Sequence, residues 1–247
     1  MSSPSRDIRD YLDRMQGIQA ALLDLIEAET DKDNKYQKLF YVLDDIKEDN
    51  NLLKSFLHLL LKVSKNHRRL PDHFTLIENI INSFKEDIQK YYSNSEIFTM
   101  FKGNRRILLY LIKTKMLKID DFVFKKMQAD KYSNYFSPEL KNYVEKDSTE
   151  TVPEIFENKR ILGQNDWDLC EIIRNDSVDE FKSYIERNRI KPTKEIINST
   201  FETNQFLIDN NPTIMEYAAF FGSIQIFKYL KSLNIEFKPS LWLYAIH

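Results

Sequence analysis

The scarcity of glycine is the feature that most constrains the fold of this chain. Only four glycines occur in 247 residues, whereas average usage would give about 17 in a chain of this length. Dinucleotide fingerprints and phosphate-binding loops need several glycines within a few positions. Gly17, Gly103, Gly163 and Gly222 each stand alone, so the sequence argues against nucleotide enzymes of those types.

Apolar residues recur at intervals of three and four along most of the chain, which is the spacing that places side chains on one face of a helix. Such rows predict helices over residues 5–29, 31–47, 51–66, 105–116 and 120–129. A further helix is predicted to start at Pro71 and Asp72 and to reach Tyr91. Ser95 is expected to cap a short helix that ends near Gly103. No segment alternates with a period of two, so we predict an all-α fold with almost no β-sheet.

The character of the sequence changes between Asp130 and Asn165. The stretch KYSNYFSPEL carries Ser137 and Pro138 in the order typical of a helix cap and first turn, and the following EKDSTETVP is polar. We interpret this region as a junction. It divides the chain into an N-terminal helical region, residues 1–147, and a C-terminal region, residues 148–247.

The C-terminal region contains an internal repeat. Residues 166–174 and 177–187 form one predicted helical pair around Asn175 and Asp176, and residues 213–221 and 223–233 form a second around Gly222. Overlaying the pairs places Asp176 on Gly222, and a third copy begins at SLWLYA, residues 240–245. Short helices that repeat in this way must stack to bury their apolar faces. We therefore predict a helical solenoid in which Gly222 ends its helix in the left-handed conformation.

The stretch TIMEYAAFFGSIQIFKYL, residues 213–230, resembles an ankyrin repeat, whose usual pattern is T-P-L-H-x-A-A-x-x-G-x-x-x-x-V-x-x-L-L. The matching residues are Thr213, Ala218, Ala219, Gly222 and Leu230. The sequence departs from the pattern at Ile214 and Glu216, which replace proline and histidine, and in a shortened hairpin between repeats.

More narrowly, the chain resembles the large ankyrin-repeat family expanded in trichomonad protists, in which an N-terminal helical domain of unknown function precedes degenerate ankyrin repeats. Residues 1–104 match that helical leader only loosely. The stretches that carry the resemblance are YFSPEL (135–140), CEIIRNDSVDEFKSYI (170–185), FETNQFLI (201–208), EYAAFFGSIQIFKYL (216–230) and PSLWLYAIH (239–247).

The resemblance implies a non-catalytic protein–protein interaction module, a scaffold or adaptor whose protein partner the sequence does not identify. In ankyrin proteins the residues just before the helix-ending glycine face a groove and contact partners. Carried over, these residues are Phe220, Phe221, Arg174 and Asn175, with His247 in the last unit. The alternative is that both phenylalanines pack against the next helical pair.

A cluster of basic residues supports a second hypothesis, nucleic-acid binding along residues 102–126. Helical solenoids bind RNA when such residues align with stacking aromatic side chains. The simpler interpretation is a solvated helix face, since the whole chain has a formal net charge of −2. The cluster comprises Lys102, Arg105, Arg106, Lys113, Lys115, Lys118, Lys125 and Lys126, and a second one comprises Lys65, His67, Arg68 and Arg69.

Enzymatic chemistry has little support in the residues. The four histidines show no paired ligand spacing, and the single cysteine excludes an intramolecular disulfide and a thiolate-cluster zinc site. Cys170 lies in WDLCEII, on the apolar side of a predicted helix, where a cysteine behaves as a small buried hydrophobe. The adjacent pairs Asp44–Asp45 and Asp120–Asp121 point apart on a helix. We predict no enzyme activity, no metal and no cofactor.

The N-terminus and the C-terminus lead to further expectations. MSSPSRDIRDYLDRMQG lacks the apolar core of a signal peptide, and no apolar run approaches ~18 residues. We therefore expect a cytoplasmic or nuclear protein with no membrane partner. At the other end the third repeat stops after one helix, which leaves its apolar side chains uncovered. Either the chain is a fragment of a longer protein, or it self-associates through this open C-terminal end.

Overall fold

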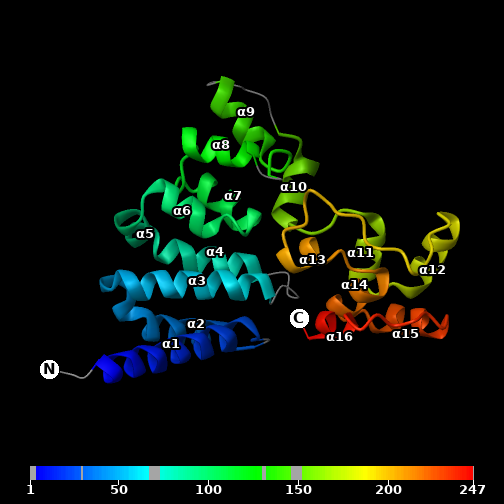
Figure 1. Ribbon diagram of the computed structural model, residues 1–247, viewed down its shortest axis with the longest axis horizontal. Helices are drawn as coiled ribbons and strands as arrows, with labels where there is room; N and C mark the ends of the chain where they lie inside the picture. The colour runs from blue at the N-terminus through cyan, green and yellow to red at the C-terminus, as the bar shows by residue number, and fades with distance from the viewer. Residues whose placement is uncertain (1–3, 29, 67–72, 130–131, 146–151, 247) are drawn as a thin grey trace. The chain divides into compact units, whose positions relative to one another are not determined.

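The protein is all-α, as predicted. The structure is a computed structural model that describes residues 4–28, 30–66, 73–129, 132–145 and 152–246. These residues form sixteen α-helices and one 3-10 helix (Figure 1). Within them, strand pairing is limited to one isolated antiparallel bridge between Glu195 and Thr213. Over the same residues, no helix is both long and apolar enough to cross a lipid bilayer.

The chain forms two compact units. Unit 1 comprises residues 1–102 and 110–117, and unit 2 comprises residues 103–109 and 118–247. The whole of the predicted C-terminal region, residues 148–247, belongs to unit 2, but the division between the units lies earlier in the chain than residue 147. The helix α7 (Arg105–Lys113) begins in unit 2 and ends in unit 1.

Unit 1 is built from helices whose apolar rows meet in one core. The first helix is the longest of those described and packs on the second and third, which lie beside it as layers in Figure 1. Leu22 of the first helix and Leu53 and Phe56 of the third are fully buried. The elements are α1 (Pro4–Ile26), α2 (Lys32–Leu43), η1 (Asp44–Glu48), α3 (Asn50–Asn66), α4 (His73–Ser83), α5 (Lys85–Tyr91) and α6 (Asn94–Phe101).

Two local predictions in unit 1 need correction. The helix expected to run to Tyr91 is interrupted at Phe84, whose amide donates to the Ile81 carbonyl, three residues back instead of four. The interruption accompanies burial of the Phe84 ring, which lies 5.4 Å from the Phe56 ring. The cap of α6 is Ser93, not Ser95, because Ser93 and Glu96 form a reciprocal capping box. The predicted start at Pro71 and Asp72 lies outside the described residues.

Unit 2 contains the two repeated helical pairs and two helices that the sequence did not predict. The unpredicted helices are α10 and α13; Gly163 ends α10 in the left-handed conformation, and the Asn204 side chain caps α13. The elements are α8 (Asp121–Ala129), α9 (Ser137–Glu145), α10 (Glu154–Leu162), α11 (Asp168–Arg174), α12 (Val178–Arg187), α13 (Gln205–Asn210), α14 (Ile214–Phe221), α15 (Ile224–Ser232) and α16 (Leu241–Ala245).

The repeated helices pack in register. Helix α11 packs on α12 and α14 packs on α15, and the two pairs contact each other through α11 with α14 and α12 with α15. Helix α16, the beginning of the third copy, then packs on α14 (Figure 1). Ile173, Ala218, Leu230 and Tyr244 are buried in their common core. A solenoid that continues through the whole chain stays a prediction.

A buried arginine explains why residues 132–145 belong with the helices that follow them. Arg160 of α10 is 1% exposed, and its guanidinium donates to Glu139 at 2.6 Å and to the Tyr135 carbonyl at 3.1 Å. The Tyr135 hydroxyl donates back to the Arg160 carbonyl at 3.0 Å. Removing one partner of a buried ion pair is strongly destabilising. These bonds therefore tie α9 to α10 across the predicted junction, part of which lies outside the described residues.

Candidate functional site

The two turns that join the helices of each repeated pair, at Asp176 and at Gly222, have the same backbone conformation. We call these turns the corners of the repeat. Gly222 has φ 67° and Asp176 has φ 51°, so both are left-handed, as predicted for Gly222. At each corner the next amide reaches back to close the helix: Ser223 donates to the Ala218 carbonyl at 2.9 Å, and Ser177 donates to the Ile172 carbonyl at 3.2 Å. This is the hydrogen bond of a Schellman helix end. The sequence overlay of the two corners is therefore matched by their geometry.

Side chains connect one corner to the other. The Asp176 carboxylate accepts from the Gln225 and Ile226 amides, both at 3.0 Å, and so caps the N-terminus of α15. In the opposite direction the Ser223 hydroxyl donates to the Ile173 carbonyl at 2.5 Å, at the end of α11. Helix termini leave amides and carbonyls without intrahelical partners. Each helical pair therefore supplies a side chain that bonds the free amides or carbonyls at a helix end of the other pair. These bonds fix how the two pairs align in the stack.

Glu216 joins the second pair to the beginning of the third. It is 3% exposed, and its carboxylate accepts from the Thr213 amide and hydroxyl, both at 2.8 Å, completing a capping box. The Ser240 hydroxyl, which overlays Thr213 in the repeat, donates to the same carboxylate at 2.5 Å. Burial would raise the pKa of Glu216, but the hydrogen bonds from Ser240 and Thr213 outweigh it and leave the pKa below its ordinary value of 4.5. The carboxylate is thus held ionised.

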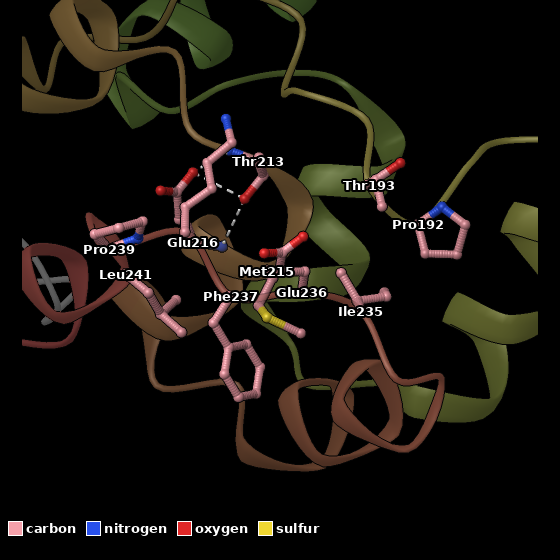
Figure 2. A pocket seen from close by; sticks show the side chains of 11 residues that line it. Pro192, Thr193, Thr213, Met215, Glu216, Ile235, Glu236, Phe237, Pro239 and Leu241 are labelled. Atoms are coloured by element: carbon pink, nitrogen blue, oxygen red, sulfur yellow. Dashed lines mark hydrogen bonds between the residues drawn. The ribbon is translucent and has the colours of Figure 1, made fainter.

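A hollow of about 320 Å³ lies beside this carboxylate, between the two segments that connect successive repeats. Figure 2 shows Pro192 and Thr193 of the first connecting segment on one side and Pro239 and Leu241 on the other, with Met215 of α14 between them. The remaining lining residues are Thr213, Glu216, Ile235, Glu236, Phe237 and Lys238. The lining is thus apolar in its middle and carries charged side chains at positions 216, 236 and 238. We call it the connector hollow.

The predicted groove residues have different environments. Phe220 is 1% exposed and lies in the core of unit 2, its ring 5.0 Å from the Phe221 ring. This burial disagrees with the assignment of Phe220 to a partner-binding groove and agrees with a packing role. Phe221 is partly buried and Asn175 is exposed. His247 lies outside the described residues.

Arg174 is committed to contacts within unit 2. Its guanidinium donates to the Asn165 carbonyl at 3.0 Å and to the Tyr217 hydroxyl at 2.8 Å, and it lies 6.0 Å from the centre of the Phe221 ring. These bonds hold α11, α14 and the segment before α11 together. Tyr217 is 1% exposed, and burial raises its pKa well above 10.

The basic residues proposed for nucleic-acid binding also differ in exposure. Lys102 and Lys113 are exposed and Arg106 is half-buried. Arg105 is only 9% exposed: its guanidinium donates to the Thr200 carbonyl at 2.9 Å and lies 5.1 Å from the centre of the Tyr132 ring. This part of the prediction needs correction, because Arg105 is mostly buried and bonded to the backbone and therefore does not present an exposed guanidinium to a phosphate. The second basic cluster, from Lys65 to Arg69, has no described side chains.

Cys170 is a buried side chain of the unit 2 core, as the sequence indicated. It is 0% exposed, and burial raises the pKa of its thiol to about 12. A thiol reacts as the thiolate, so Cys170 is almost entirely in its unreactive form at neutral pH. Among the described residues, no group of three His, Cys, Asp or Glu side chains is placed to hold a metal ion.

The functional residues that sequence reasoning missed are the polar links of the stack. The sequence overlay places Asp176 at the turn equivalent to Gly222 but does not predict that it caps α15. It places Ser240 at the position of Thr213 but does not predict that it bonds Glu216. Both bonds join residues in successive repeats. A signal was present for Ser240, because it takes the place of Thr213 in the overlay and carries the same hydroxyl.

Comparison with known proteins adds no relative to this description. No protein-family model, no curated protein and no solved structure matches the chain.

Proposed function

We propose that this chain is a non-catalytic module that binds another protein, a scaffold or adaptor of ankyrin type. The observation that carries the proposal is the connector hollow, held open between two repeats whose register is fixed by Asp176, Ser223 and Glu216. A hollow with an apolar middle and charged residues beside it suits an apolar side chain of a partner flanked by polar groups. Because its walls are already ordered, binding costs little conformational entropy.

The capping box supports the ankyrin resemblance at the point where the sequence departs from the pattern. Glu216 stands where the pattern has histidine, and its carboxylate bonds the Thr213 amide and hydroxyl. It also accepts from Ser240 of the following unit. Glu216 thus links the second helical pair to the beginning of the third, and membership of the trichomonad-type ankyrin family stays our proposal.

The proposal that the chain is not an enzyme is supported by the state of its most reactive side chains. The Cys170 thiol has its pKa raised to about 12 by burial, which removes its nucleophilic form at neutral pH. The Glu216 carboxylate is bonded to three donors in the fold. We propose a cytoplasmic or nuclear location, and self-association through α16 as a second mode of assembly.

The alternative, nucleic-acid binding along residues 102–126, has weaker support because Arg105 is buried. It has its own test, which is the salt dependence of RNA and DNA binding. Nucleic-acid binding with a steep salt slope that is lost on reversing Arg106 and Lys113 to glutamate would favour it over the proposed function.

The proposed function is tested by blocking the connector hollow. Thr193 is exposed on its wall, so Thr193→Arg should obstruct the hollow without disturbing the core. Thr99→Arg, on the exposed face of α6, is the matched control. We expect affinity capture from the source cell to recover one protein with the wild type and the control and to lose it with Thr193→Arg. Equal recovery with all three proteins, or recovery of no specific protein, would contradict the proposal.

A further inference from the structure

Helices α12 and α15 hold equivalent places in successive repeats. Each follows a left-handed corner residue, Asp176 or Gly222, and each packs on the first helix of its own pair. The overlay that matches the corners also matches the helices: Val178, Phe181 and Ile185 of α12 correspond to Ile224, Phe227 and Lys231 of α15. Residues with these spacings share one face of a helix. The two rows can therefore be compared directly.

In α12 this row is partly buried at Val178 and buried at Phe181 and Ile185, and α15 packs on α12. Phe181 is 0% exposed and Ile185 is 7% exposed. The Phe181 ring lies 6.1 Å from the ring of Tyr229 of α15 in an edge-to-face arrangement. The row is thus the surface on which the next helix of the stack packs.

In α15 the same row remains open. Ile224 is 60% exposed, Phe227 is partly buried and Lys231 is exposed. The ring of Phe237 stacks on that of Phe227 at 6.4 Å and is itself 46% exposed. We call these four residues, Ile224, Phe227, Lys231 and Phe237, the α15 edge. The preceding repeat shows what covers such a row, namely an amphipathic helix.

The α15 edge differs from its counterpart in charge. Lys231 stands where α12 buries Ile185, and Lys228 lies one turn earlier, also exposed. Helix α15 contains no acidic residue, whereas α12 carries Asp179 and Glu180 in its first turn. A helix that packs on this edge must therefore supply acidic side chains beside its apolar ones.

We propose that the α15 edge binds an amphipathic, acidic helix of another protein, in the place that α15 occupies on α12. This inference rests on the proposed function and assigns it a second contact surface. The apolar row supplies the contact area, and the two lysines favour a partner with negative charge. A basic helix is disfavoured because its charges would face Lys228 and Lys231.

The test uses the full chain and two stapled helical peptides with the sequence of residues 223–234. One peptide keeps the native, basic sequence. In the other, Gln225, Lys228 and Ser232 are replaced by glutamate; Gln225 and Ser232 flank Tyr229 on the face that packs on α12. Fluorescence anisotropy should show binding of the acidic peptide, with the native peptide at least about tenfold weaker. In the chain, Ile224→Asp should abolish binding, and the double variant Lys228→Glu, Lys231→Glu should reverse the preference between the peptides. Ile155→Asp on α10, at a residue 73% exposed, should change nothing.

Five results would overturn the proposal. Binding of neither peptide would mean that the edge does not bind a helix, and equal binding of both would mean that it does not select charge. Unchanged binding of the acidic peptide to Ile224→Asp would place the contact on another surface. Binding of phosphatidylcholine–phosphatidylglycerol vesicles that Ile224→Asp abolishes would assign the edge to lipid. A dimer in light scattering that Ile224→Asp dissolves would assign it to a second copy. The proposed function is tested separately by affinity capture with Thr193→Arg. The two experiments therefore show which of the two conclusions is contradicted.

Discussion

At the scale of single residues, the chain makes left-handed turns largely without glycine. Among the described residues, two glycines, Gly163 and Gly222, have a positive φ. Six residues other than glycine also have a positive φ, including Asp176, Arg189 and Asn234. Asp and Asn tolerate this conformation better than most residues because their short polar side chains can hydrogen-bond locally. The scarcity of glycine therefore does not mean a scarcity of helix ends.

The two isolated glycines Gly17 and Gly222 should respond oppositely to alanine. Gly17 lies within α1 and has open space where the methyl group of an alanine would lie, so Gly17→Ala should raise the free energy of unfolding by about 1 kcal/mol. Gly222 also has open space but a φ of 67°, so Gly222→Ala should lower it by about 1 kcal/mol. Gly222→Val should lower it further. Urea denaturation measures all three, and a neutral Gly222→Val would contradict the helix-end assignment.

Glu216 should make unit 2 sensitive to acid. Because its pKa is lower in the folded chain than its ordinary value of 4.5, its contribution to stability is present above that value and is lost as the pH falls through the folded pKa. We expect Glu216→Gln, which retains an acceptor for the Thr213 amide, to lose less stability between pH 7 and pH 3 than the wild type. Urea midpoints at the two pH values measure this. Glu96→Gln, in the exposed capping box of α6, is the control and should show a smaller difference; equal acid sensitivity of Glu216→Gln and wild type would contradict the role.

At the scale of elements, the stack depends on a cap supplied by the preceding repeat. Asp176→Ala removes both acceptors for the Gln225 and Ile226 amides and should cost about 1 kcal/mol. Asp176→Asn keeps one acceptor and tolerates the left-handed conformation, so its cost should be smaller. Hydrogen exchange should show the loss of protection at the start of α15. Protection unchanged in Asp176→Ala would mean that water replaces the carboxylate without cost.

The elements also show how far the sequence could be interpreted. Periodicity predicted α12 and α15 because each buries one continuous row, and the overlay predicted the corner at Gly222. Helix α13 was missed because it has only six residues. Helix α10 was missed because its apolar residues Ile155, Ile161 and Leu162 are exposed, whereas its buried side chain is Arg160, which bonds Glu139 of α9. The burial of Arg105 depends on Thr200, and that of Phe220 on the stacked rings around it. Such contacts are set by tertiary packing, which local spacing does not encode.

At the scale of the whole molecule, the two compact units can be followed by different spectroscopic signals. Both tryptophans, Trp167 and Trp242, belong to unit 2, whereas helices of both units contribute to circular dichroism. Phe56→Ala, in the core of unit 1, should cost about 3–5 kcal/mol and shift the dichroism transition without shifting tryptophan fluorescence. Leu230→Ala, in the core of unit 2, should shift the fluorescence transition. Coincident shifts of both signals in both variants would indicate one cooperative body.

The burial of Cys170 has a practical consequence for studying this molecule. Because the only cysteine of the chain is buried and its thiol is protonated at neutral pH, it should not react with maleimide dyes in the folded chain. A second cysteine introduced in place of Thr193 or Ile224 would then take a dye selectively, with the native one left in place. Each proposed contact surface can thus carry its own reporter on an otherwise unaltered chain.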